Sequence, residues 1–160
     1  MPVRVAPVRA RLWIIAPVRL LLGAAALAAS LVGGVNGRPA LIGFGAGALF
    51  TAFTVVSDRR SLFFADRERP GPLPEGAVHQ PWWRTALDAS IPSTMGLAVL
   101  SVIALATHHA VLAAILGGAL AGLGIAAVMA AADLRAWERR EGACLYLEGG
   151  GARRRFLEPV

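Results

Sequence analysis

Three aspartates each lie beside arginines at the ends of apolar segments. Carboxylates can act as general acids or bases, and guanidinium groups bind phosphate through paired hydrogen bonds. The candidate charge cluster consists of Asp58, Arg60, Asp88, Asp133 and Arg135. Gathered on one membrane face, these residues could hold a lipid phosphate. Ordinary charge pairing at helix ends gives the same pattern, so a lipid-headgroup enzyme is the weakest of three functional hypotheses.

A second candidate is a polar stripe inside an apolar segment. Ser90, Thr94, Ser101 and His108 fall within about 40° of one another on a helical wheel, so they should face other helices. Hydroxyl groups there bond to their own helix or to a neighbour. A translocation path is the alternative reading. The later apolar segments carry no deep charge of the kind that marks ion routes.

Further catalytic patterns are missing from the sequence. It contains no HExxH, GxSxG or Walker glycine motif and only one cysteine, Cys144. His108 and His109 are adjacent and would point in different directions on a helix, which makes a poor metal site. We therefore expect no catalytic residue, no metal ligand and no cofactor.

Four long apolar segments must position these groups. Residues 39–57, 89–107 and 110–132 are uncharged and match the ~20 residues that cross a hydrocarbon core. The first segment, 20–35, is shorter and is expected to recruit residues 17–19, with Arg19 reaching the headgroups. A cleavable signal peptide is the alternative for this segment, given Ala28, Ala29 and Ser30.

Arginine positions predict the orientation of the segments. The chain has 16 basic residues, all of them arginine, and Arg38 is the single one in either predicted external loop. Because basic residues stay cytoplasmic, both termini should lie inside. The predicted divisions are a basic cytoplasmic arm (1–16), a first transmembrane hairpin (17–57), a cytoplasmic loop (58–88), a second transmembrane hairpin (89–132) and a cytoplasmic tail (133–160).

The net charge of +6 does not indicate nucleic-acid binding. The loop and the tail nearly balance their own charges, so the excess lies in the arm, which would contact anionic lipid headgroups. In the tail, a helix should end at Gly142, and residues 144–147 and 153–157 have the pattern of short strands. The tail is thus predicted to be either β-hairpin-like or disordered.

Glycines predict how the helices pack. Gly43 with Gly47, and Gly118 with Gly122, are GxxxG pairs that permit close helix approach in a membrane. An offset of about 75 residues superposes these pairs, and also Asp58 on Asp133 and Arg60 on Arg135, which suggests two parallel helical-hairpin repeats. The predicted fold is an all-α bundle of four transmembrane helices, with repeats as one possibility.

These patterns favour a small non-enzymatic protein of the bacterial plasma membrane. It would act as an accessory or assembly subunit through helix packing and cytoplasmic contacts. Its expected partners are anionic lipid and either another membrane protein or a second copy of itself. The alternative is a small transporter or channel, as a homodimer, that uses the polar stripe.

Overall fold

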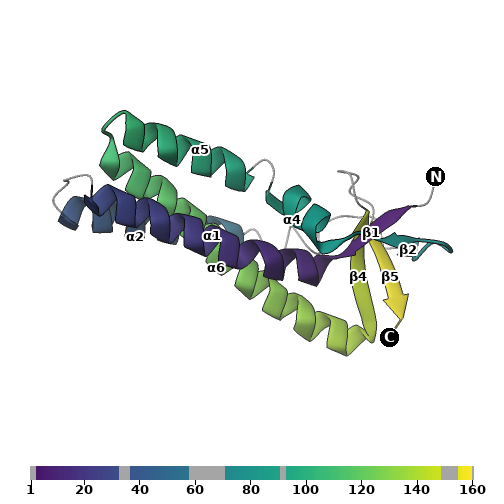
Figure 1. Ribbon diagram of the computed structural model, residues 1–160. Helices are drawn as coiled ribbons and strands as arrows, with labels where there is room; N and C mark the ends of the chain where they lie inside the picture. The colour runs from purple at the N-terminus through teal and green to yellow at the C-terminus, as the bar shows by residue number, and fades with distance from the viewer. Residues whose placement is uncertain (1–2, 33–36, 58–70, 91–92, 149–154, 160) are drawn as a thin grey trace.

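The computed structural model describes residues 3–32, 37–57, 71–90, 93–148 and 155–159. Most of them are helical, and the long helices form a bundle with a small sheet at one end (Figure 1). Within the described part, three helices are long and apolar enough to cross a membrane: α1 (Val8–Val32), α2 (Gly37–Ser57) and α6 (Ala110–Glu141). The chain is thus a mostly helical protein suited to a membrane.

The predicted third span is broken in the structure. Helix α4 (Trp82–Ser90) and helix α5 (Ser93–Ala106) meet at an angle of 62°, and together they count as a fourth candidate span. Pro92 follows α4 in the sequence, and a proline disfavours helical geometry in the residue before it. The single helix predicted over residues 89–107 is therefore not confirmed, and α4 covers the end of the predicted loop.

Helix α1 is longer than the predicted first span. It starts at Val8, so Pro17 lies inside the helix and not in its first turn. A proline removes one backbone hydrogen bond, but packing holds the preceding turns in place. Val8 packs with Leu134 of α6, and Ile15 and Ala16 pack on Ala127 of the same helix.

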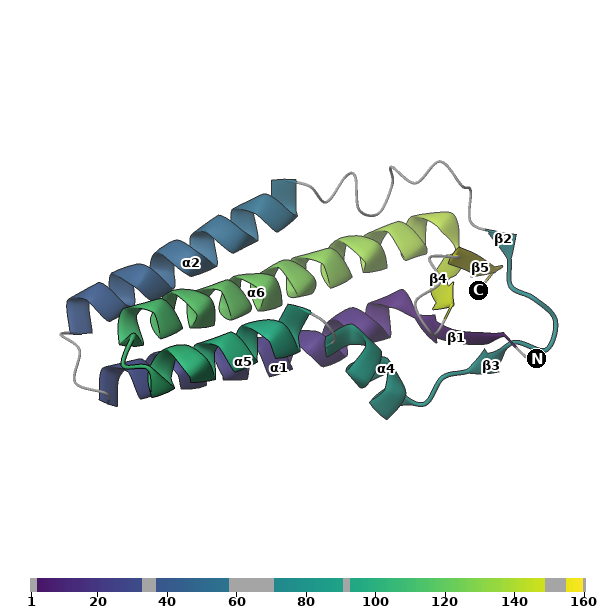
Figure 2. The same ribbon diagram turned by 90° about the horizontal axis from the view of Figure 1, so that it is seen from above.

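Helix α6 is the centre of the bundle. It packs along α1 and α2 and also contacts α5, and Figure 2 shows it running between α2 and α5. Its buried positions are mostly alanine and glycine, which let neighbouring backbones come close. The predicted end of α6 is confirmed: Gly142 has φ 62° and its N–H donates to the carbonyl of Glu138.

The structure adds a five-stranded sheet to the predicted all-α bundle. Its strands, in chain order, are β1 (Arg4–Pro7), β2 (Gly71–Pro72), β3 (Val78–His79), β4 (Ala143–Glu148) and β5 (Arg155–Pro159). The spatial order is β2-β5-β4-β1-β3. Strand β4 is antiparallel to both β1 and β5, whereas the short edge strands β2 and β3 pair in parallel with β5 and β1.

A small apolar core joins this sheet to the ends of the helices. Val8 of α1, Leu134 of α6 and Leu145 of β4 are each 5% exposed and pack together. The side chains around them are Leu12, Trp137, Leu147 and Leu157. Segments from the predicted arm, loop and tail therefore form one structural unit at the same end of the bundle (Figure 1).

The two hairpins do not pack as a symmetric pair. A twofold axis along the membrane normal would place Gly47 beside Gly122. Gly47 instead lies against Ile115 and Ala119, about one helical turn away. The same axis would relate the contact between α1 and α6 to one between α5 and α2. Helix α6 packs extensively along α1, but α5 and α2 make no contact of similar extent. The repeat thus remains a pattern of the sequence that the helix packing does not mirror.

Candidate functional site at the junction of helices and sheet

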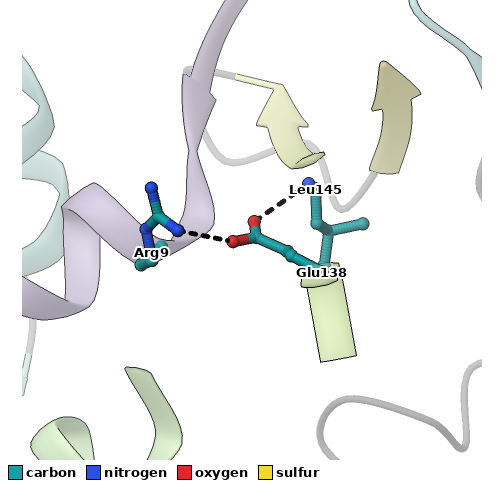
Figure 3. Close-up of polar contacts among 3 residues, drawn as sticks. All are labelled: Arg9, Glu138 and Leu145. Atoms are coloured by element: carbon teal, nitrogen blue, oxygen red, sulfur yellow. Dashed lines mark hydrogen bonds and ion pairs between the residues drawn. The ribbon is translucent and has the colours of Figure 1, made fainter. Parts of the chain in front are cut away.

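A buried carboxylate links the helices to the sheet. Glu138, near the end of α6, has a side chain 6% exposed. Its Oε2 accepts a hydrogen bond from Arg9 Nη1 at 3.1 Å, and its Oε1 accepts one from the backbone N–H of Leu145 at 3.3 Å (Figure 3). One side chain thus joins α1, α6 and β4. A buried charge needs such partners, because its desolvation is costly.

Two further arginines of α1 bind the broken third span. Arg11 donates to the carbonyl oxygen of Asp88 at 2.7 Å, and Gln80 donates to the Asp88 carboxylate at 2.7 Å. Deeper in α1, Arg19 donates through Nε to the hydroxyl of Thr94 at 2.8 Å and through Nη2 to that of Ser93 at 3.1 Å. Arg19 therefore contacts the start of α5, beyond its expected role at the headgroups.

Strand β4 carries two side chains whose pKa values are raised. Burial raises the pKa of Tyr146 to about 12, and a hydrogen bond with Glu158 adds to the shift. The ring of Tyr146 also contacts that of His79, with centroids 5.5 Å apart. Burial likewise raises the pKa of the Cys144 thiol, with a further contribution from Glu138. Both groups thus stay protonated at neutral pH.

The candidate charge cluster is only partly visible. Asp58 and Arg60 lie outside the described residues. Asp88 lies on α4, which packs against α1, whereas Asp133 and Arg135 are exposed on α6. Asp88 meets Arg11 and Gln80, and these contacts do not include Asp133.

The polar stripe is divided by the helix ends. Thr94 and Ser101 are 1% and 4% exposed, and Ser101 donates to the carbonyl of Leu97 in its own helix. Ser90 ends α4, and its side chain lies outside the described part. His108 lies beyond the end of α5 with φ 61°, a left-handed geometry that is uncommon for residues other than glycine but that histidine adopts more often than most. The helical spacing used to predict the stripe does not apply to His108.

The four predicted packing glycines lie between α2 and α6. A Cβ atom added to Gly47 would overlap the carbonyl oxygen of Ile115, and one on Gly118 that of Phe44. A Cβ on Gly122 would overlap the carbonyl of Ala48, and one on Gly43 would come 3.0 Å from Ile115. Their part in assembling the protein stays a prediction.

An apolar cavity lies between α1, α5 and α6. Its volume is about 230 Å³. It is lined by Leu22, Ala25, Ala26, Ala29, Ala98, Ser101, Val102, Leu105 and Leu120. Ser101 is the one polar residue of the lining, and its hydroxyl bonds to its own helix, so the cavity suits an apolar occupant.

Sequence reasoning missed Glu138, and it missed the hydrogen bonds of Arg19 to α5. Glu138 follows Leu134 by one helical turn and so falls on the buried stripe of α6, a signal that was readable in the sequence. Arg19 is a charge within an apolar helix, which is itself a functional signal. Among the described residues, no group of three or more His, Cys, Asp or Glu side chains could hold a metal ion.

Comparison with protein-family models, with curated proteins and with solved structures found no match to this chain.

Proposed function

We propose that this chain is a non-enzymatic accessory or assembly protein of a bacterial plasma membrane, and that it presents its sheet to a partner protein. One observation carries the proposal. The arm, the loop and the tail, which are far apart in sequence, combine into a single sheet fixed to the helix ends. A preorganised surface loses little conformational entropy when a partner binds.

The contacts of the sheet support a rigid surface. Glu138 holds both Arg9 and the N–H of Leu145, and three leucines of the sheet pack on the helix ends. At one edge, β2 contains Pro72, which blocks further strand pairing. At the other edge, Val78 of β3 is 49% exposed. The β3 side is therefore the proposed contact for a partner.

The proposed orientation places this sheet in the cytoplasm. The arginine distribution supports this, because all the extramembrane segments at the sheet end are rich in arginine and the opposite end carries Arg38. The hydrogen bonds of the hydroxyl groups favour a role in helix packing over a role in transport. The Thr94 hydroxyl accepts a hydrogen bond from Arg19, and the Ser101 hydroxyl donates one within its own helix.

Site-specific photo-crosslinking in native membranes tests the proposal. A photoreactive residue at Val78 should yield a covalent adduct with one other protein. The same residue at Val99, which is 56% exposed on α5, is the control and should yield no adduct with that protein, because we expect lipid around this apolar helix. The proposal fails if Val78 gives no protein adduct or gives the same adducts as Val99.

A further inference from the structure

Arg19 is a cation in an apolar helix, and its described surroundings hold no counter-charge for it. The rest of its helix between Leu20 and Val32 is uncharged. Arg19 donates hydrogen bonds to two hydroxyl groups, and among the described residues no carboxylate pairs with it. Hydroxyls accept hydrogen bonds but do not neutralise charge, and an uncompensated charge is costly in a membrane. The site therefore favours an anion.

The apolar cavity begins next to this cation. Leu22 and Ala26 follow Arg19 on the same stripe of α1, and Ala98 and Leu105 follow Thr94 along α5. The cavity thus lies along the two helices that the Arg19–Thr94 hydrogen bond joins. An apolar cavity of about 150 Å³ is enough to bind benzene, and this one is about 230 Å³.

We infer that the protein binds one anionic phospholipid between α1 and α5. The phosphate pairs with the Arg19 guanidinium, and one acyl chain enters the apolar cavity. The charge selects an anion, and the adjoining apolar lining selects a lipid over a soluble phosphate. This site is separate from the proposed protein contact at β3 and does not depend on it.

Native mass spectrometry of the full chain in mild detergent tests this inference. The probes are phosphatidylglycerol and phosphatidylcholine with identical acyl chains. One basic side chain near the phosphate should favour the anionic lipid by about fivefold. Arg19→Gln should remove this preference. Arg139→Gln, which removes an exposed arginine of α6 outside the candidate charge cluster, should keep it.

A second pair of variants tests the cavity without touching Arg19. Ala29→Leu fills part of the cavity and should lower retention of both lipids. Ala24→Leu is the control, because it adds the same bulk on an exposed face of α1 outside the cavity. This variant should retain both lipids as well as the unmodified chain does. Equal binding of the two lipids, a preference that survives Arg19→Gln, or equal retention by the two leucine variants would each overturn the inference.

Discussion

At the scale of single residues, Glu138 does the most to join the parts of the molecule. It contacts α1, β4 and its own helix, so its removal leaves both Arg9 and a buried N–H without their acceptor. In the count of charges along the sequence, Glu138 is one of the acidic residues that offset the arginines of the tail. Its role depends on the tail folding back, which charge counts do not reveal.

Replacing Glu138 should loosen the sheet. We expect Glu138→Ala to lower the free energy of unfolding by about 1–3 kcal/mol, because a buried donor loses its acceptor. The measurement is the midpoint of unfolding in a denaturing-detergent titration. Glu141→Ala, an exposed acid at the same helix end, is the control and should change little. Equal midpoints for the two variants would contradict the proposed junction.

Tyr146 offers an optical test, since it is the chain's one tyrosine. Its folded pKa of about 12 lies above the ordinary value of about 10. The folded state therefore holds the proton longer, and the stability this gives is present below pH ~10 and lost as the pH rises towards 12. Absorbance titration should show phenolate forming near pH 12. Glu158→Gln should lower that midpoint, because it removes the carboxylate charge, and an unshifted midpoint would exclude the Glu158 carboxylate as a cause.

At the scale of elements, local sequence predicted the long helices better than their breaks. Apolar length indicated α1, α2 and α6, because crossing a membrane requires it. Pro17 and Pro92 look alike in sequence, yet α1 continues through Pro17 whereas α4 ends before Pro92. The difference lies in packing: the residues before Pro17 are buried against α6, a contact that local sequence does not encode.

The close approach of α2 and α6 gives the sharpest prediction at this scale. Gly47→Ala should destabilise the bundle, because the added Cβ would overlap the Ile115 carbonyl. Gly45→Ala in the same helix should be tolerated, since a Cβ there meets nothing within 4 Å. The same detergent titration would compare them. If both variants unfold at the same point, the two helices are not packed through Gly47.

At the scale of the whole molecule, the sheet could not be predicted in full. The alternating residues of the tail indicated strands near β4 and β5. The arm was expected to contact lipid, but Arg4–Pro7 forms β1 between β4 and β3. The polar stripe is divided for a related reason, because helix ends and neighbours decide which side chains meet. The charge cluster stays a prediction, since Asp58 and Arg60 lie outside the described residues. Pairing between distant segments leaves little trace in local sequence.

The proposed orientation can be tested with the chain's one cysteine, Cys144 in β4. A membrane-impermeant maleimide should label it in inverted vesicles and not in right-side-out ones. Because burial raises the pKa of this thiol, labelling should be slow at neutral pH and faster at pH ~9, where more thiolate forms. Labelling in right-side-out vesicles alone would reverse the topology.

The position of β1 also sets an order of assembly. This strand leaves the ribosome before any of the long helices, yet its antiparallel neighbour β4 follows the last of them. During synthesis β1 can pair with β3 before α6 has been made, but its other edge stays open until β4 follows α6. The sheet can therefore close only after the last long helix has been synthesised.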